Sequence, residues 1–434
     1  MDRRVVITGL GWVTPLGHDV ESVWERMLAG DCGIAKTTLF DAATFPTNFA
    51  AEVKEIDLAK FLGEDAARHE GASRNTRFAL AACSMAFQNA GLSGNGIVDR
   101  TRVGVYLGGG EGPLDFSAFA KAALYGCRAE DGSYGSLDTV RWAKSALVEL
   151  NPVNEMEQDP NLAGGHLAVQ FKAQGPSLNT LTACAASTQA IGEAAAVIRY
   201  GDADVMISGG THSMIHPLGV TGFNRLTALS TRNDACRTAS RPFDRTRDGF
   251  VLGEGAGILI LEELEHARTR GANILAEVIG YGSTADAFRI TDLHEEGRGP
   301  IAAMRAALSA AGVDPGEVDY VSAHGTGTEE NDKIETLALR TVFGPHADTI
   351  AVSSIKSMIG HLIAAAGAVE LITCVLAIRD GVVPPTINYS HEDPNCGLDY
   401  VPNQSRRKDV HIALSNSFGF GGQNDTLLIR AYEA

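Results

Sequence analysis

The chain has 434 residues and a formal net charge of −17, and 44% of its residues are hydrophobic. This length suits one large α/β unit or two similar halves, while the charge argues against nucleic acid and anionic membranes as partners. No apolar run reaches the roughly 18 residues of a membrane span, and we expect no signal peptide. The seven cysteines contain no C-x-x-C pair, which argues against disulfides or a zinc ribbon and predicts a reducing, cytoplasmic location.

The first predicted element is a buried strand at residues 5–9, which runs into the glycine-rich stretch GLGWVTPLG. As a dinucleotide-binding fingerprint this stretch fails, because Thr14 occupies the position of the third glycine and Pro15 follows it. We interpret the stretch as a tight turn.

Two later stretches share one pattern. PSLNTLTAC leads into a helix at residues 187–200, and TIAVSSIKSMIGH leads into an almost wholly apolar helix at residues 362–378. Their endings, VIRYGDADV and AIRDGVVPP, lie 180 residues apart, with Gly201 and Gly381 as helix stops. The spacing predicts an internal duplication in a layered α/β fold, with both halves sharing one core because no linker separates them.

Cys184 lies in the segment LTACAAST, among small residues and just before the first of these helices. A free thiol is only a few per cent ionised at neutral pH, and a helix N-terminus lowers its pKa. The placement therefore suits a nucleophile, and a buried structural thiol is the alternative.

Two histidines and one glycine-rich loop have matching positions at the ends of strand-like runs. VSAHGTGT places His324 there, and SSIKSMIGH places His361. The carboxyl ends of strands are where α/β folds gather their ligands. In SNSFGFGGQND the glycines bring backbone N–H groups close to a ligand and supply an oxyanion donor; a plain hairpin turn is the alternative.

Glu370 is the only charge in the apolar helix at residues 362–378. A buried carboxylate without a partner costs several kcal/mol, so a counter-charge must lie nearby. Lys356, in an equally apolar stretch, is the available one. We expect the two side chains to form one hydrogen-bond network that positions His361.

The segments TAC (182–184), HGTGT (324–328), KSMIGH (356–361) and NSFGFGG (416–422) together resemble the elongating β-ketoacyl-[acyl-carrier-protein] synthases of the thiolase superfamily. The resemblance covers essentially the whole chain and extends to polyketide ketosynthase α subunits. It implies a thiolase-like α/β fold with two duplicated halves in α-β-α-β-α layers. Residues 1–270 would carry the nucleophile, and residues 271–434 would carry both histidines and the Gly-Phe-Gly-Gly loop.

The resemblance implies a decarboxylative Claisen condensation in fatty-acid or polyketide elongation. Cys184 would accept an acyl group from acyl-carrier protein (ACP), and His324 and His361 would assist decarboxylation of malonyl-ACP. The carbanion would then attack the acyl thioester to give β-ketoacyl-ACP. Two imidazole N–H donors suit the charge that develops in decarboxylation, so no metal is needed.

Further roles follow from the same resemblance. The N–H groups of Cys184 and Phe420 would meet the oxyanion of acyl transfer, and Phe420, between Gly419 and Gly421, would gate the site. Thr326 and Thr328 would hold the phosphopantetheine arm that ACP carries, which is the only cofactor implied. The family pairs into homodimers, with a heterodimer as the alternative.

The chain also departs from the family pattern. The segment at residues 111–162 is longer than usual, so chain-length preference cannot be transferred. After His324 the chain reads Glu329-Glu330-Asn331, and the two extra acids near the phosphopantetheine entrance should weaken the binding of anionic carriers. A basic cluster could meet ACP, although a solvated helix face explains each member: Arg68, Arg74 and Arg77. His212 and His216 lack a third ligand for zinc.

Two other functions remain open. One is a thiolase-like acyltransferase that does not decarboxylate, although such an enzyme would want a second cysteine where this chain has histidines. The other is a non-catalytic subunit that shapes the chain-length pocket of a heterodimeric ketosynthase. Retention of Cys184, His324 and His361 together argues against that scaffold role.

Overall fold

The computed structural model describes residues 3–93, 98–110, 112 and 114–433. Ten of the described strands form one sheet in the order β10-β9-β13-β14-β8-β1-β7-β6-β4-β5. These strands are β1 (Val5–Val13), β4 (Val103–Gly109), β5 (Ser177–Thr180), β6 (Val205–His212), β7 (Gly255–Glu263), β8 (Ala276–Ala285), β9 (Tyr320–Ser322), β10 (Ala351–Ser353), β13 (Ile412–Gly419) and β14 (Gln423–Arg430). Two short antiparallel pairs lie outside it: β2 (Ala35–Lys36) with β3 (Phe49–Ala50), and β11 (Val382–Val383) with β12 (Arg406–Arg407).

The sheet consists of two five-strand groups with the same topology. In the first group, β6, β4 and β5 run parallel, whereas β7 pairs antiparallel with β6 and β1. In the second, β13, β9 and β10 run parallel, and β14 pairs antiparallel with β13 and β8. The groups join where β1 meets β8, at Val6 opposite Glu277 and Ile7 opposite Ala276. The predicted duplication is therefore present in the strand order; the division into domains at residue 270 stays a prediction.

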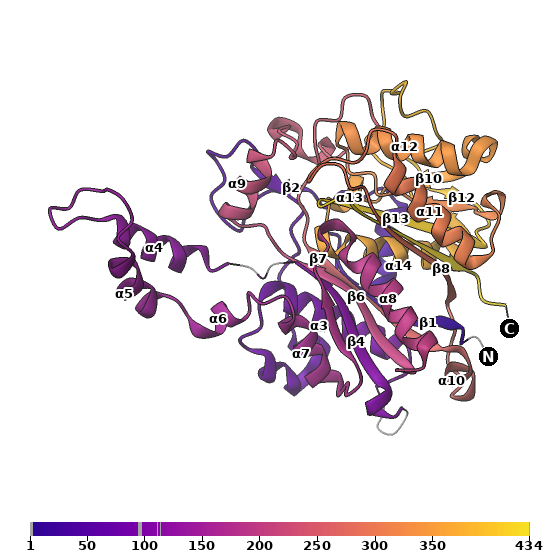
Figure 1. Ribbon diagram of the computed structural model, residues 1–434, viewed down its shortest axis with the longest axis horizontal. Coiled ribbons are helices and arrows are strands. Elements are labelled where there is room, and N and C mark those ends of the chain that lie inside the picture. The colour runs from indigo at the N-terminus through magenta and orange to yellow at the C-terminus, as the bar shows by residue number, and fades with distance from the viewer. Residues whose placement is uncertain (1–2, 94–97, 111, 113, 434) are drawn as a thin grey trace.

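Helices cover both outer faces and fill the space between the two groups (Figure 1). α3 and α7 pack on the first group, α11 and α12 pack on the second, and α8 and α14 lie between them. The predicted layered α/β fold is confirmed. The helices are α1 (Val20–Leu28), α2 (Ala59–Leu62), α3 (Arg74–Asn89), α4 (Phe116–Cys127), α5 (Thr139–Glu149), α6 (Pro152–Met156), α7 (Leu162–Phe171), α8 (Ala186–Tyr200), α9 (Pro217–Arg225), α10 (Leu264–Thr269), α11 (Arg298–Ala311), α12 (Glu329–Phe343), α13 (Lys356–Ile359) and α14 (Ala366–Asp380).

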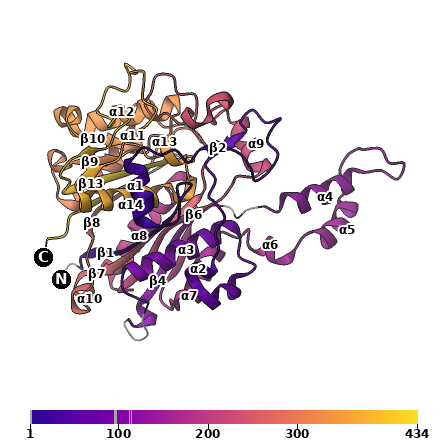
Figure 2. The ribbon, with the colours of Figure 1, turned by 180° about the vertical axis from the view of Figure 1, so that it is seen from behind.

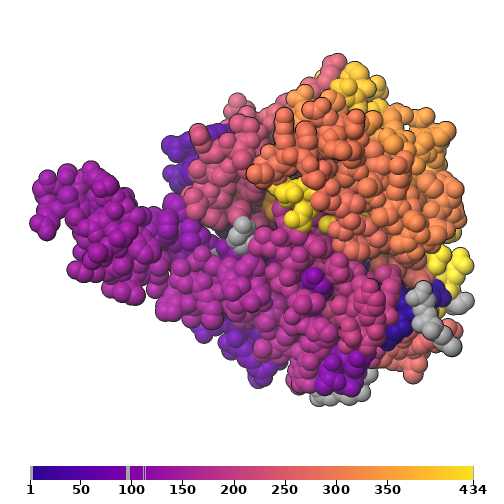
Figure 3. Space-filling view, viewed as in Figure 1, coloured from indigo at the N-terminus to yellow at the C-terminus, as the bar shows by residue number. Residues whose placement is uncertain are grey.

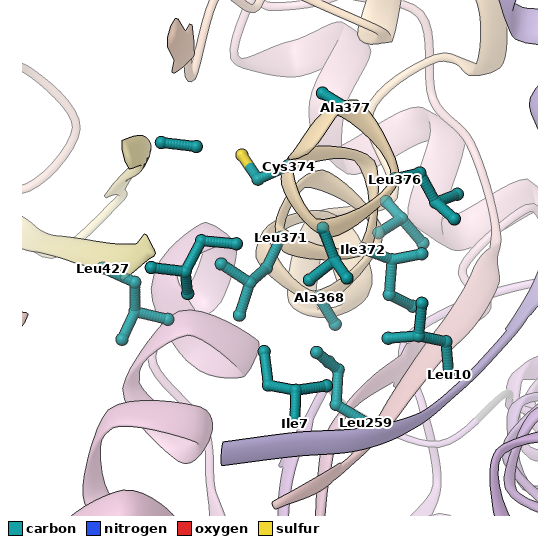
Figure 4. Packing of buried hydrophobic residues seen from close by; sticks show 14 of the residues in the cluster. Ile7, Leu10, Leu259, Ala368, Leu371, Ile372, Cys374, Leu376, Ala377 and Leu427 are labelled. Carbon is teal, nitrogen blue, oxygen red and sulfur yellow. The ribbon is translucent and has the colours of Figure 1, made fainter. Parts of the chain in front are cut away.

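The central layer explains the apolar character of α14. Every residue from Ala366 to Ala377 is buried, because this helix contacts strands of both groups and helix α8 as well. Leu371 packs in one cluster with Ile7 and Leu259 of the first group and Leu427 of the second (Figure 4). A helix enclosed in this way must be hydrophobic all round.

The two central helices begin in the same unusual way. α8 follows the short 3-10 turn η3 (Ala183–Ala185), and α14 follows η7 (Ile363–Ala365). Ala183 and Ile363 have positive φ angles of 48° and 45°, in the left-handed region that non-glycine residues rarely adopt. Such strain persists where the surrounding structure imposes it, often at functional sites. Cys184 lies within η3, and His361 lies just before η7.

One segment projects from the layered body (Figures 1 and 2). It contains α4, α5 and α6, and corresponds to the stretch that the sequence marks as longer than usual. Several of its large apolar side chains are exposed, with Leu147 at 87% and Val148 at 81%. Among the described helices, none is both long and apolar enough to cross a membrane.

Replacing Leu371 tests the central layer. Leu371→Ala should lower the free energy of unfolding by about 2–5 kcal/mol, because a buried methyl-rich side chain is removed from a packed core. Urea unfolding followed by circular dichroism measures the change. Leu337→Ala on the outer helix α12, where the side chain is partly exposed, is the matched control and should cost about 0.5 kcal/mol or less. Equal losses for the two variants would contradict the proposed layering.

Candidate active site

The ends of three separate elements bring Cys184, His324 and His361 together. Nε2 of His361 lies 3.0 Å from Sγ of Cys184. The rings of His324 and His361 are 5.4 Å apart between centroids and stand edge to face. All three side chains are buried, and one ligand-capable atom from each lies within 4.8 Å of the others. The convergence that the sequence predicts is present.

These three residues line a cavity of about 470 Å³. Near Cys184 the wall consists of the apolar side chains Met214, Phe223, Phe250 and Ile363, together with three histidine rings: His212, His324 and His361. The opposite part is polar and reaches the surface through residues 326–331 and 291–292. In Figure 3 the yellow C-terminal part of the chain is visible in a hollow between the magenta and orange regions. A cavity with one apolar and one polar part suits an acyl chain joined to a polar carrier arm.

The ring of His361 is held in one tautomer. Its Nδ1 accepts a hydrogen bond from the backbone N–H of Ile363 at 3.3 Å, so the neutral ring carries its hydrogen on Nε2, which faces Sγ. Its backbone N–H donates to the carbonyl of Val251 at 2.7 Å. Burial, reinforced by the charge of Lys356, holds the pKa of His361 well below its usual value.

His324 is held by a different set of partners. Its backbone N–H donates to Oε1 of Glu335 at 2.8 Å, and its carbonyl accepts from Nζ of Lys356 at 2.6 Å. Nζ also lies 3.5 Å from Nδ1 of the ring, which again leaves the hydrogen on Nε2. Burial first, and then Lys356, lowers the pKa of His324 far below its usual value. Both rings are therefore neutral, with an N–H turned toward the cavity.

Lys356 and Glu370 form the predicted buried ion pair. Burial raises the pKa of Glu370 to about 7, against the opposing effect of Lys356. The prediction that this pair positions His361 was wrong, however. Lys356 contacts His324 through its carbonyl and Nδ1, whereas His361 is held by backbone groups of the η7 turn and of residue 251. The lysine reaches the end of β9 because α13 begins directly at residue 356.

Glu335 is a site residue that the sequence analysis missed. It is buried on α12, and its two oxygens accept the backbone N–H groups of His324 and Gly325, each at 2.8 Å. Burial raises its pKa to about 7. The sequence pattern that could have identified it is a carboxylate on the apolar face of a helix, beside Ile334 and Leu339.

The thiol of Cys184 is not activated in the resting site, contrary to the expectation from its helix N-terminus. Burial raises its pKa to about 11. The charge of Lys356 and the backbone N–H groups of Phe420 and of Cys184 itself oppose this effect without overcoming it. The thiol is protonated at neutral pH, so its proton must leave as it attacks.

The Gly-Phe-Gly-Gly loop is both a hairpin turn and a wall of the site. It connects β13 to β14, with Gly421 at φ +89°, and Gly419 lies opposite Gln423. A Cβ on Gly419 would lie 3.0 Å from the carbonyl oxygen of Thr182 and 3.3 Å from the nitrogen of Cys184. The glycine thus permits the loop to approach η3 and turns the N–H of Phe420 toward the sulfur.

The remaining candidates divide between the mouth of the cavity and the scaffold. Thr326 and Thr328 line the polar part, and their hydroxyls are 2.9 Å apart. Of the predicted basic cluster, Arg74 pairs with the buried carboxylate of Glu254 at 2.5 Å, while its own side chain is 31% exposed. The docking role of Arg68, Arg74 and Arg77 stays a prediction. His212 lines the cavity. Four residues later, Nδ1 of His216 accepts a hydrogen bond from the N–H of Gly219 at the start of α9.

The donors at the centre of the site suit an oxyanion better than a metal ion. Zinc would require a lone pair on Nε2 of each ring. The N–H of Ile363 and the ammonium of Lys356 occupy both Nδ1 lone pairs, which leaves hydrogens on the two Nε2 atoms. The sequence-based prediction of a site without metal is consistent with these tautomers.

Comparisons with known proteins cover the whole chain. Residues 2–267 match the family described as "Beta-ketoacyl synthase, N-terminal domain", and residues 275–390 match "Beta-ketoacyl synthase, C-terminal domain". The chain is 43% identical to "3-oxoacyl-[acyl-carrier-protein] synthase 2" of Coxiella burnetii over 98% of both chains, and 43% identical to the protein of that name from Synechocystis over 99% of both.

Solved structures agree with these sequence matches. A β-ketoacyl synthase from Burkholderia phymatum has a TM-score of 0.87 at 31% identity, and 99% of this chain and all of that one are covered. A type II polyketide ketosynthase, solved with its acyl-carrier protein and bound to the hexaketide, has a TM-score of 0.86 at 34% identity over all of both chains. The expected thiolase-like fold is confirmed.

Breaking the buried ion pair should destabilise the protein. Lys356→Met leaves Glu370 without its counter-charge and should lower the free energy of unfolding by about 3–5 kcal/mol. The double variant Lys356→Met/Glu370→Gln should regain part of this loss, because the uncompensated carboxylate is removed. Arg268→Met, which breaks the exposed pair with Glu265, is the control and should cost less than about 1 kcal/mol. A double variant no more stable than Lys356→Met would contradict the assignment.

The pH dependence of stability should reveal the buried imidazole of His212. In the unfolded chain this ring binds a proton below about pH 6.5, whereas burial lowers the pKa of the folded ring to about 4. Between these values protonation stabilises only the unfolded chain. The stability of His212→Leu relative to the native chain should therefore rise as the pH falls from about 6.5 to 4, by on the order of 3 kcal/mol. A relative stability that is constant across this range, measured by urea unfolding, would be the contrary result.

Proposed function

Because the chain belongs to the β-ketoacyl synthase family, we propose that Cys184, His324 and His361 carry out its reaction. The protein is a carbon–carbon bond-forming acyltransferase that condenses an acyl thioester with malonyl-ACP in chain elongation. The observation that carries the residue assignment is the contact of 3.0 Å between Nε2 of His361 and the sulfur, beside a second neutral imidazole in one cavity.

In the first half-reaction the sulfur of Cys184 attacks the carbonyl carbon of acyl-ACP. A sulfur–carbon bond forms, the carbon–sulfur bond to the carrier arm breaks, and the thiol proton passes to the departing carrier thiolate. Negative charge develops on the carbonyl oxygen, where the backbone N–H groups of Cys184 and Phe420 can donate. Those two groups already point toward the sulfur in the resting site. Such a donor contributes about 10²–10³ in rate.

In the second half-reaction the thioester oxygen of malonyl-ACP lies between the two imidazoles. The carbon–carbon bond to the carboxylate breaks, carbon dioxide leaves, and the electron pair becomes an enolate whose oxygen accepts the N–H groups of His324 and His361. The enolate carbon attacks the carbonyl carbon of the acyl group on Cys184, the carbon–sulfur bond breaks, and the departing Cys184 thiolate takes up a proton from solvent. Neutral rings suit this role, since each carries a fixed hydrogen without requiring a counter-ion in the apolar cavity.

ACP supplies both substrates on its phosphopantetheine arm, and we propose that no other cofactor takes part. Thr326 and Thr328 would hydrogen-bond the amides of the arm at the polar mouth of the cavity. The all-free cysteines support a reducing, cytoplasmic compartment. A homodimer is supported by the edge strand β5 and by the exposed apolar side chains of α4 and α5, both of which another copy could cover.

The tautomers also favour decarboxylation over the two alternative functions. A thiolase-like acyltransferase without decarboxylation needs a general acid or base where this site has two N–H groups held in place by Ile363 and Lys356. A non-catalytic subunit would have no use for a buried ion pair that holds an imidazole. Neither alternative accounts for the second ring.

Separate assays of the two half-reactions test the proposal. His324→Ala and His361→Ala should each lower carbon dioxide release from malonyl-ACP by about 10²–10³-fold, while Cys184 still becomes acylated by acyl-ACP. Cys184→Ala should abolish acylation and retain carbon dioxide release. Mass spectrometry of the intact protein and trapped labelled carbon dioxide provide the measurements.

The exposed His411→Ala is the control and should leave both half-reactions unchanged. Loss of acylation with full carbon dioxide release in the histidine variants would overturn the division of roles.

A further inference from the structure

His212 is a polar side chain in the part of the cavity nearest Cys184 that no step of the proposed reaction uses. It is the last residue of β6, and it lines the cavity together with Cys184, Met214 and Phe223. Only 1% of its surface is exposed. Among the described residues, neither ring nitrogen has a hydrogen-bond partner.

The direction of the ring follows from the alternation of side chains along β6. Thr211 faces outward and donates to the carbonyl of Asn75 on α3. Gly210 faces the central layer, where a Cβ would touch Ser187 and Ala364 at the starts of the two central helices. His212 is two residues beyond Gly210 and so shares its face. The ring lies against Gly110, where a Cβ would be 2.3 Å from its Nδ1, and its electrostatic effect on His361 places it on the side of the reactive sulfur.

Leaving both nitrogens of a buried imidazole without partners is costly. A buried donor or acceptor that makes no hydrogen bond loses its hydration without compensation. Among the described residues, the apolar side chains Met214, Phe223, Phe250 and Ile363 of the same cavity give the ring no hydrogen-bond partner. If the cavity received only saturated chains, an apolar residue at position 212 would avoid this free-energy cost.

We propose that His212 recognises an oxygen atom on the bound acyl chain, so that the enzyme prefers acyl chains carrying a hydroxyl or keto group over saturated chains of equal length. The inference deepens the proposed function and rests on it. The neutral ring has one donor and one acceptor nitrogen. A hydroxyl group can satisfy either nitrogen, and a keto oxygen can accept from the N–H.

A series of acyl-ACP substrates that differ only in the position of one hydroxyl group tests the proposal. Acyl-ACP substrates of one length, each with a single hydroxyl at a different carbon, are compared with the saturated acyl-ACP in condensation with malonyl-ACP. At one carbon, or at two adjacent ones, kcat/KM should exceed that of the saturated chain by about tenfold or more, because the buried nitrogen gains a partner. A flat profile would mean that the ring is hydrated by water only and would overturn the inference.

Variants at the same site identify the residue responsible. His212→Leu should abolish the preference for the hydroxyl-bearing chain, and His212→Gln, which keeps a donor and an acceptor, should retain part of it. His216→Asn is the matched control four residues along, where the residue caps α9 outside the cavity, and the full preference should remain. A preference that survives in His212→Leu would assign the recognition elsewhere and overturn the inference.

The same samples separate this inference from the proposed function. Acylation of Cys184 by the saturated chain and carbon dioxide release from malonyl-ACP are recorded for the native protein. If both occur while kcat/KM does not depend on the position of the hydroxyl group, only the proposed role of His212 fails. If the native protein forms no acyl-Cys184 with any chain, the proposed function itself fails.

Discussion

The neutrality of two buried imidazoles is the constraint on which the site depends. Each ring has its Nδ1 lone pair occupied, His361 by a backbone N–H and His324 by a lysine ammonium. Each ring is also too deeply buried to take up a proton near neutral pH. Two fixed N–H groups consequently face one small volume beside a thiol. A ring free to change tautomer would present a lone pair there and repel the developing oxyanion.

The two neutral rings lie near a buried lysine, whose positive charge must be compensated by carboxylates outside the reactive volume. Lys356 is buried, and its ammonium is compensated by Glu370 on α14, while Glu335 on α12 accepts the N–H groups of the loop that follows β9. One cation and two carboxylates thus hold His324 from three elements without a charge contact on its cavity-facing nitrogen. This arrangement orients the ring while it leaves the reactive volume uncharged, which a solvent-exposed site could not achieve.

Much of this could be predicted from the sequence, because the relevant signals are local. The recurrence of helix endings 180 residues apart predicted the duplicated layers, and the lone acid in an apolar helix predicted the pair of Lys356 with Glu370. Contacts across the fold could not be predicted. The partner of the ion pair depends on how α13 meets the end of β9, the orphaned ring of His212 depends on which face of β6 meets the cavity, and Arg74 faces a buried glutamate. The thiol pKa depends on total burial, which the helix N-terminus alone does not reveal.

The two short turns that precede the central helices have the same backbone and different chemistry. Position 364 occupies in η7 the place that Cys184 occupies in η3, and it is an alanine. Two identical chains related by a twofold axis cannot place a thiol at one such turn without placing it at the other. Covalent fusion of the repeats removes that restriction. The molecule can therefore keep one sulfur and one methyl group at equivalent points, and its pseudosymmetric frame encloses a single asymmetric reaction chamber.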